Sequence, residues 1–332
     1  MADPNRSASR VTVLLALAMN AVIAAAKLIA GAVSGSSSML AEGAHSIADT
    51  VNELFLLTSL RRSARPADST HPFGYGSERF FWSLLAAIGI FVSGAVFSMY
   101  QAVTALTGPT DTGAQSYTWS YVVLGMAFVA EGVSWIRSVV QLRREATAAD
   151  RGFVSHLSRS RDPTVKTVFS EDAAALIGIG LAAAGIGLHQ ATGDRIWDAA
   201  GAAAIAILLT LVAFHLGRHN MALLIGQSAD PALRQELWNE LMGVPEVDAV
   251  VELLTMHIGT DEILLAARLD LADGLDSDEI EDVSSRVERQ IGRRHPEVTQ
   301  VFLDATRAST RQRARAHRMV DSSPGETSAS NH

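Results

Sequence analysis

Hydrophobic residues are distributed very unevenly along this chain. Six long apolar segments follow one another over its first part, at residues 11–33, 39–60, 80–106, 117–142, 165–189 and 196–217. Each has about 20 residues or more, which is enough for an α-helix to cross the hydrocarbon core of a bilayer. We therefore predict a membrane all-α six-helix transmembrane bundle at residues 11–220, preceded by a polar N-terminal tail at residues 1–10.

After residue 226 the pattern changes and no further spanning segment occurs. Helical and β-like periodicities alternate instead, separated by turn signals. They predict a helix at 231–241, strands at 247–256 and 263–271, a helix at 276–294 opened by a capping box of Asp276 and Glu279, and a strand at 298–303. This αββαβ order predicts a small α+β cytoplasmic domain at residues 227–306, followed by a disordered tail at 307–332. Because so small a core is marginally stable, we expect a homodimer.

Charge predicts the orientation of the spans. Basic residues are concentrated in two of the connections between spans. The connection after the second segment has Arg61, Arg62, Arg65 and Arg79, and the connection after the fourth has Arg143, Arg144, Arg151, Arg159, Arg161 and Lys166. Since Lys and Arg accumulate on the cytoplasmic side, these connections and both termini are expected in the cytoplasm. We therefore expect a multi-pass protein of the plasma or inner membrane.

Several classes of function are excluded or disfavoured by what the sequence lacks. It contains 0 cysteines, which excludes disulfides and thiolate metal sites. The first apolar segment has no cleavage signature of small residues, so we interpret it as a retained helix. Neither a His-Glu-x-x-His nor a Gly-x-Ser-x-Gly motif occurs, so a hydrolase is not expected. We predict no enzyme activity, no prosthetic group and no nucleic-acid partner.

A polar pair lies inside the second apolar segment. His45 and Asp49 are four residues apart, so a helix brings them to one face about one turn apart. Placing a carboxylate near the middle of a membrane helix costs roughly 2.5–3.5 kcal/mol on the scale derived from membrane insertion. A carboxylate at such a position is therefore expected to have a partner or a function. The pair therefore predicts an intramembrane cation site. Glu42 shares this face and is a further candidate ligand, although a hydrated position near the membrane surface is the alternative.

A second acidic cluster begins the fifth segment. Asp172 is the expected donor from this helix, because zinc prefers four tetrahedral ligands and the second segment supplies two of them. Glu171 is the neighbour of Asp172, and neighbouring side chains on a helix point about 100° apart. Glu171 is therefore either a further ligand, or a proton carrier or ion-pair partner. The other polar residues of the spans are interpreted as structural hydrogen-bonding groups, namely Asn20, Lys27, Asn52, Glu131, Asp198 and His215.

These motifs resemble the cation diffusion facilitator family, whose members exchange divalent transition metals for protons. The matching stretches are Leu-Ala-Glu-Gly-Ala-His-Ser-Ile-Ala-Asp at 40–49, Asp-Ser-Thr-His-Pro-Phe-Gly-Tyr-Gly-Ser-Glu-Arg-Phe-Phe-Trp at 68–82, and Glu-Asp-Ala-Ala-Ala-Leu at 171–176. The resemblance implies four ligands, at His45, Asp49, residue 168 and Asp172. Residue 168 is a valine, which cannot ligate, and the Glu-Asp pair resembles a branch that includes a mitochondrial zinc carrier. Glu171, Glu42 or water could supply the fourth ligand.

The resemblance also implies sites outside the spans. A loop site of an Asp and two His would fall on Asp68 and His71, with Tyr75 at the third position. The metal site of the family's cytoplasmic domain is not recognisable, because the aligned positions are Val251, Arg268 and Leu303. His257 and His295 are isolated candidates.

We predict a proton-coupled antiporter that exports a divalent transition metal, zinc in the first instance, between helices 2 and 5. Metal and protons compete for the same ligand atoms, and His45 titrates near neutrality, so it is the expected coupling residue. The alternatives are export of manganese, iron or cobalt by the same mechanism, or a regulatory membrane protein that has lost transport. The expected partners are the ion, protons and the lipid bilayer.

Overall fold

The structure is a computed structural model. It describes residues 4–107, 117–148, 152, 163–309 and 312, and the side chains of these residues except 4–16, 19, 145, 148 and 163–168. Most of the predicted tail at 307–332 and the basic residues Arg151, Arg159 and Arg161 lie outside this description. The chain forms two compact units, Met1–Arg65 with Glu78–Met221, and Pro66–Ser77 with Ala222–His332.

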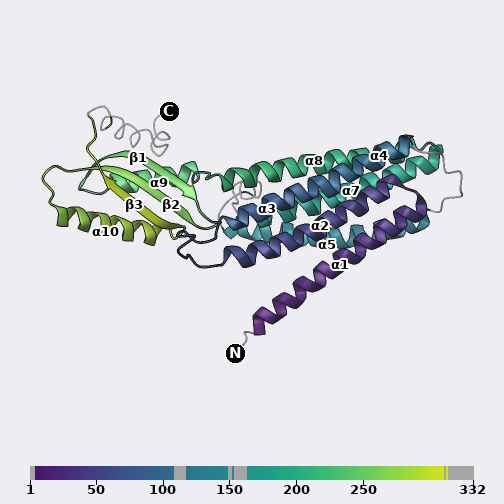
Figure 1. Cartoon of the computed structure of the whole chain (residues 1–332), viewed down its shortest axis with the longest axis horizontal. Coiled ribbons are helices and arrows are strands. Elements are labelled where there is room, and N and C mark those ends of the chain that lie inside the picture. Colours follow the sequence, from purple (N-terminus) through teal and green to yellow (C-terminus); the bar gives the residue numbers. More distant parts are fainter. Residues whose placement is uncertain (1–3, 108–116, 149–151, 153–162, 310–311, 313–332) are drawn as a thin grey trace, which may run out of the picture. The chain divides into compact units, whose positions relative to one another are not determined.

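The first unit is helical throughout its described part (Figure 1). Its elements are α1 (Pro4–Ser34), α2 (Ser37–Ser63), α3 (Glu78–Gly89), the π-helical turn η1 (Ile90–Val96), α4 (Phe97–Thr107), α5 (Thr118–Ala148), α7 (Pro163–Thr192) and α8 (Ile196–Leu224). Helix α2 contacts α1, α3, η1, α4 and α7, so it lies at the centre of this unit. The predicted polar tail at 1–10 is helical from Pro4 onward.

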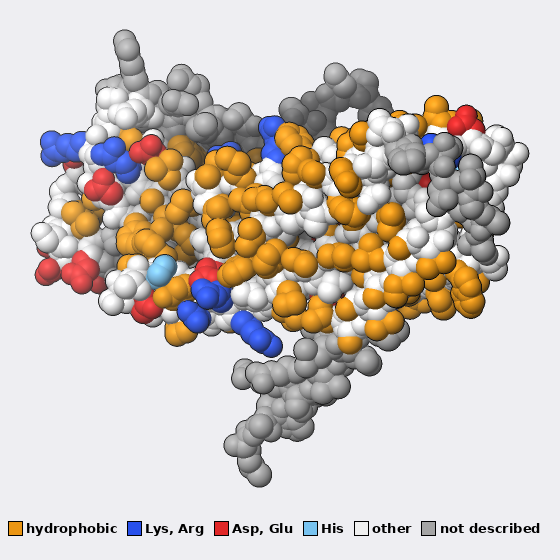
Figure 2. Space-filling model, turned by 45° about the vertical axis from the view of Figure 1, so that its right-hand side comes forward, with side chains coloured by type: hydrophobic (Ala, Val, Ile, Leu, Met, Phe, Trp, Pro, Cys, Tyr) orange, Lys and Arg blue, Asp and Glu red, His pale blue; other side chains and the backbone are white. Residues whose placement is uncertain are grey.

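Four helical stretches of the described residues are long and apolar enough to cross a membrane: Glu78–Thr107, Thr118–Arg144, Phe169–Thr192 and Ile196–Leu224. Hydrophobic side chains cover much of the visible face of this unit (Figure 2). Helix α1 contributes a shorter apolar stretch, Asn20–Ser34. Helix α2 is long enough but carries three carboxylates, Glu42, Asp49 and Glu53, which make it less apolar. The predicted number of six spans is therefore not confirmed.

The start of α2 is tied to α8. Asp198 accepts hydrogen bonds from the hydroxyl groups of Ser36, Ser37 and Ser38, and from the backbone N–H of Ser37. Ser36 also caps the helix by accepting from the backbone N–H of Met39. Orphan N–H groups at a helix start need such acceptors. These bonds fix the end of α2 that lies about two turns before His45.

The second unit has the predicted αββαβ order. It contains α9 (Pro231–Met242), β1 (Val247–His257), β2 (Ile263–Leu271), α10 (Ser277–Arg294) and β3 (Val298–Ala305). The sheet order is β1-β2-β3, with β1 and β2 antiparallel and β2 and β3 parallel. The predicted capping box of Asp276 and Glu279 is confirmed. The apolar stripes of the two helices form a core with the sheet, through Leu233, Leu237, Leu241, Val283, Val287 and Ile291.

The opposite face of this sheet carries two cross-strand rows. Leu254, Ala266 and Phe302 are in register, and Leu254 and Phe302 are exposed. The next row pairs Arg268 with Asp304 at 3.1 Å. The segment between α2 and α3 also belongs to this unit, because the ring of Phe73 lies edge-on to Phe302 and Ser77 donates to the carbonyl oxygen of Ile258.

Candidate functional site

The polar pair of the second segment lies on α2 as its spacing predicts. His45 Nδ1 is 3.5 Å from Asp49 Oδ1, and the His45 side chain is buried. Neither ring nitrogen of His45 has a hydrogen-bond partner among the described residues. A buried imidazole without hydrogen-bond partners is costly, so its presence calls for an explanation.

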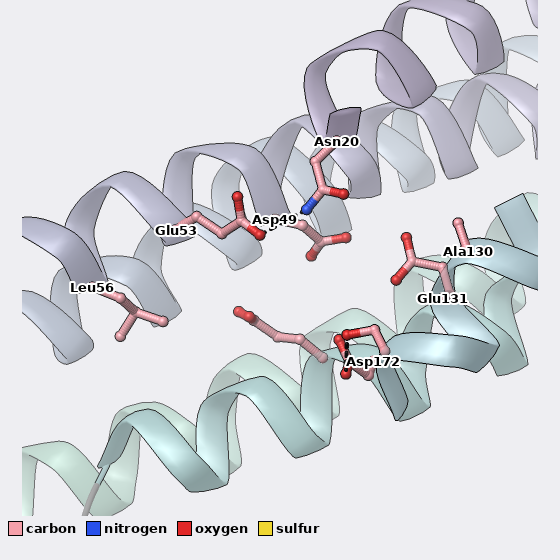
Figure 3. A pocket seen from close by; sticks show the side chains of 9 residues that line it. Asn20, Asp49, Glu53, Leu56, Ala130, Glu131 and Asp172 are labelled. Atoms are coloured by element: carbon pink, nitrogen blue, oxygen red, sulfur yellow. Dashed lines mark hydrogen bonds between the residues drawn. The ribbon is translucent and has the colours of Figure 1, made fainter. Parts of the chain in front are cut away.

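Directly beyond this pair, four helices enclose a polar cavity of about 120 Å³. Five carboxylates line it, together with Asn20, Leu56, Ala130 and Ser134: Asp49 and Glu53 of α2, Glu131 of α5, and Glu171 and Asp172 of α7. Asp49, Glu53, Glu131 and Asp172 point into one shared space (Figure 3). Like charges this close repel one another strongly in an apolar surrounding, so the cavity favours positively charged occupants.

Three of these carboxylates are held by neutral donors. Asn20 Nδ2 donates to Glu53 Oε1 at 2.7 Å, and Ser134 Oγ donates to Asp172 Oδ2 at 2.9 Å. The Asn52 side chain donates to Glu171 Oε2, while Glu171 Oε1 is buried without a partner. Among the described side chains, no Lys or Arg forms an ion pair with any carboxylate of the cavity. These neutral donors fix the geometry of the carboxylates but do not neutralise their charge.

Glu42 has a different environment. Its Oε2 accepts a hydrogen bond from Lys27 Nζ at 2.9 Å, and both side chains are 0% exposed. Lys27 also donates to Ser46 Oγ at 2.7 Å. On its other side Glu42 packs against Gly178 of α7, where a β-carbon would overlap Glu42 Oε1. Glu42 therefore has a resident cation and does not line the cavity.

The structure thus brings together part of the predicted site. Asp49, Glu171 and Asp172 line one cavity and His45 adjoins Asp49. Val168 lies in α7, and its side chain is not among those described. Within the described part of the chain, no three His, Asp or Glu side chains converge closely enough to hold one metal ion. Asp49 of α2 and Asp172 of α7, one predicted ligand from each helix, line the same cavity (Figure 3).

Four polar residues of the cavity were not among the predicted site residues: Asn20, Glu53, Glu131 and Ser134. Asn20 and Glu131 had been interpreted as structural groups, and Asn20 does make such a hydrogen bond. Glu53 continues the i, i+4 series of His45 and Asp49, so the helical period could have indicated it.

The loop candidates Asp68 and His71 lie together in a turn of the second unit. Asp68 accepts from the hydroxyl and backbone N–H of Thr70, from the backbone N–H of His71 and from the hydroxyl of Tyr75. These bonds, those from Thr70 and Tyr75 above all, hold the pKa of Asp68 well below its usual range. His71 Nδ1 is 3.7 Å from Asp68 Oδ1. The aspartate therefore stabilises the turn with both of its oxygens.

Two other positions considered in the second unit have protein partners. His295 Nε2 is 3.2 Å from Glu240 Oε2, and Arg268 bonds to Asp304.

Comparison with known proteins identifies the family. The model of the cation efflux transmembrane domain matches residues 13–225. The chain is 33% identical over 258 residues to the mitochondrial proton-coupled zinc antiporter SLC30A9 of Xenopus laevis, an alignment that covers 78% of this chain and 46% of that protein. It is 32% identical over 237 residues to metal tolerance protein C4 of Arabidopsis thaliana, covering 71% of this chain and 51% of that protein. The chain therefore spans about half the length of these relatives.

A third relative is matched over nearly its whole length. The manganese efflux system protein MneP of Bacillus subtilis is 26% identical over 310 residues, which cover 91% of this chain and 97% of that protein. The matched family domain, the apolar helices and the relatives agree on an integral membrane protein. The chain belongs to the cation efflux family, the cation diffusion facilitators, and is related to the mitochondrial zinc carrier.

Proposed function

We propose that this protein is a proton-coupled antiporter, and not an enzyme, that exports a divalent transition metal from the cytoplasm. The observation that supports this most strongly is the cavity, in which five carboxylates from three helices lack any resident cation among the described side chains. Such a site needs a mobile cation for charge balance. Metal ions and protons are the cations that carboxylates and imidazole bind alternately.

The proposed ion ligands are His45, Asp49 and Asp172, with Glu171 in place of the missing ligand at residue 168. A shift of α7 against α2 would narrow the cavity and bring these groups onto one ion. Protons arriving from the opposite side would then displace the metal from the same atoms, with His45 as the proposed coupling residue. This competition couples the two fluxes.

Zinc is the proposed substrate, because one imidazole with carboxylates suits it well. Manganese is a second candidate, because the charged groups that line the cavity are all carboxylates, and oxygen ligands suit manganese. In addition, one relative is named for manganese efflux. Iron and cobalt could be exported by the same mechanism.

The remaining architecture is also proposed. It comprises six membrane spans within residues 11–220, of which α1 and α2 provide the first two, and a cytoplasmic domain at 227–306. The protein is proposed to lie in the plasma or inner membrane, with both termini in the cytoplasm. A homodimer would cover the open sheet face, whose exposed Leu254 and Phe302 lie beside the charged row of Arg268 and Asp304. Asp68 and His71 are proposed to stabilise their turn and to bind metal weakly at most.

Transport by the purified chain in liposomes under a pH gradient tests the proposal. Zn²⁺, Mn²⁺, Co²⁺ and Fe²⁺ are offered separately to wild type, Asp49→Asn, Asp172→Asn and Glu171→Gln, with Glu288→Gln on the exposed face of α10 as the charge-matched control. We expect zinc transport to fall at least 100-fold in Asp49→Asn and Asp172→Asn and to persist in Glu288→Gln. Transport of no metal by wild type, or unchanged transport in both Asp variants, would refute it and favour a regulatory membrane protein.

A further inference from the structure

We propose that the helical unit binds internal water at a second polar site, formed by Ser59 of α2, Ser83 of α3 and Asn220 of α8. The site is separate from the carboxylate cavity, because none of these three residues lines that cavity. Water bound here would extend an aqueous path from the proposed cytoplasmic end of the unit toward the cavity. This role rests on the proposed transport function, whereas the binding of water does not.

The three side chains are fully buried without hydrogen-bond partners. Ser59 is 0% exposed, and Ser83 and Asn220 are each 1% exposed. Among the described residues, neither serine hydroxyl has a partner, and neither Oδ1 nor Nδ2 of Asn220 has one. Buried polar groups are nearly always paired with protein or with ordered water, because an unpaired group keeps the full cost of its desolvation. Four such atoms on three helices therefore indicate a bound ligand.

Contacts deeper in the unit show how the three helices are aligned. A β-carbon on Gly94 of η1, which continues α3, would lie 2.9 Å from Leu209 of α8 and 3.9 Å from Ala48 of α2. The three polar residues each lie 11 residues from these positions, toward the proposed cytoplasmic end. Eleven residues make about three helical turns, or about 16 Å, and return to nearly the same helix face. The alignment therefore brings the three polar side chains to one level.

Contacts between α2 and α3 near that level agree with the alignment. The ring of Trp82 lies 5.8 Å from the ring of Phe55, and the guanidinium of Arg62 lies 5.7 Å from the Trp82 ring. Ser59 falls about midway between these two residues of α2, and Ser83 directly follows the tryptophan. The two serines therefore lie at the same height on neighbouring helices.

Contacts between α3 and α8 extend the alignment to Asn220. A β-carbon on Gly217 would lie 3.9 Å from both Ala87 and Leu84. Because α3 and α8 run in opposite directions, a step of three residues from Gly217 to Asn220 corresponds to a step back along α3 toward Ser83. The amide of Asn220 therefore reaches the level of the serines from the third helix.

The set of unpaired atoms fits water and not a metal ion. The amide of Asn220 needs a hydrogen-bond donor for Oδ1 and an acceptor for Nδ2, and each serine hydroxyl can both donate and accept. A cation would satisfy the oxygen atoms alone and leave Nδ2 unpaired. Water both donates and accepts, and a buried water typically makes about three hydrogen bonds. The three side chains are also uncharged, so they offer no counter-charge to an ion.

The position of the site along α2 gives its water a role. Leu56, which lines the carboxylate cavity, precedes Ser59 by about one turn. Arg62 follows Ser59 by about one turn, and its side chain is 47% exposed. The polar site thus lies along α2 between the exposed end of the unit and the cavity, with Leu56 before the cavity. Water at this place would shorten the apolar stretch that a proton or an ion has to cross.

Radiolytic footprinting of the full-length chain in nanodiscs tests for this water, because hydroxyl radicals formed from water modify the side chains that adjoin it. Leu216 lies one turn from Asn220 on the same face of α8, and Leu209 is its matched reference, since both leucines are buried on one helix. In wild type, Leu216 should be modified at least 5-fold faster than Leu209.

A triple variant tests the three side chains. In Ser59→Ala, Ser83→Ala, Asn220→Leu the difference between the two leucines should fall below twofold. It should persist in Ser120→Ala, whose buried hydroxyl has the protein partner Ser34. The triple variant should melt no lower than wild type, because apolar groups replace unpaired polar ones. In the liposome assay its maximal rate of transport should nevertheless fall at least 5-fold, a loss that a purely structural role would not produce without destabilisation.

Three outcomes overturn the inference. Equal modification of Leu216 and Leu209 in wild type would mean that the site contains no water, and this comparison needs no variant to fold. Labelling that changes when choline replaces Na⁺ and K⁺ would mean that a cation occupies the site. Unchanged labelling in the triple variant would mean that other groups hold the water.

Failure of the transport proposal gives a different result. Wild type that moves no metal but shows the faster modification of Leu216 keeps the water site and refutes transport. A triple variant that has lost the labelling difference but transports at the wild-type rate keeps transport and removes this water from its route.

Discussion

Replacing Lys27 by methionine is expected to destabilise the helical unit strongly. Lys27 Nζ and Glu42 Oε2 are 2.9 Å apart, and both side chains are 0% exposed. Methionine has a similar length but no charge, so Lys27→Met leaves the Glu42 carboxylate buried without a counter-ion. Removing one partner of a buried ion pair typically costs about 3–5 kcal/mol.

This cost can be measured as a shift in thermal unfolding. For a unit of about 200 residues, 1 kcal/mol corresponds to roughly 2–4 °C, so the melting temperature should fall by about 6–20 °C. Fluorescence-detected unfolding in one detergent at one scan rate makes the variants comparable. The double variant Lys27→Met, Glu42→Met should recover most of the loss, because apolar replacement of both partners is often nearly neutral.

A surface ion pair provides the matched control. Arg62 and Glu78 are 3.6 Å apart, but their side chains are 47% and 23% exposed. Arg62→Met should therefore cost only about 1 kcal/mol or less. A melting temperature of Lys27→Met within about 2 °C of wild type would contradict this prediction. So would a loss in the double variant equal to the sum of the losses of Lys27→Met and Glu42→Met measured separately, because the two residues would then not be coupled.

Two further predictions concern packing and pH. Gly178→Ala should lower the melting temperature, because its β-carbon would overlap the immobilised Glu42 carboxylate, whereas Gly180→Ala, with no atom within 4 Å, should be neutral or stabilising in the same assay. In the second unit, the hydrogen bond from Arg286 to Glu246, at 2.6 Å, holds the pKa of Glu246 below its ordinary 4.5. Its contribution to stability is therefore present above pH 4.5 and is lost as the pH falls through the lower folded pKa. Arg286→Gln should weaken this acid dependence of hydrogen-exchange protection in α10, and an unchanged profile would contradict it.

The local features of the chain were predictable from its sequence. The apolar periods, the capping box of Asp276 and Glu279 and the i, i+4 pair of His45 and Asp49 each depend on residues only a few positions apart. The helices and strands of the second unit accordingly lie within a few residues of their predicted bounds. Local periodicity determines which residues lie on the same face of a helix or strand, and this information was sufficient to predict these elements.

The partners across helices were not predictable in the same way. Asn20 bonds to Glu53 and Asn52 to Glu171, pairs that are 33 and 119 residues apart in the sequence. Nothing in the period of α5 distinguishes Glu131 at a cavity from a polar residue that makes one structural hydrogen bond. The packing of the segment 66–77 on the second unit depends on contacts such as Ser77 with Ile258, 181 residues apart. Such contacts are set by tertiary packing, which a single sequence does not encode visibly.

The same tertiary contacts narrow the question of the fourth ligand. Sequence left Glu42, Glu171 and water as alternatives, since Glu42 shares the helical face of His45 and Asp49. In the structure Glu42 is compensated by Lys27, so ligation of a metal by Glu42 would leave Lys27 buried without a counter-ion. That would cost about 3–5 kcal/mol before any gain from the metal. Glu171 carries no such penalty, because its neutral partner Asn52 can keep Oε2 while Oε1 receives the ion. Charge compensation within the fold therefore favours Glu171, or water held by it, over Glu42.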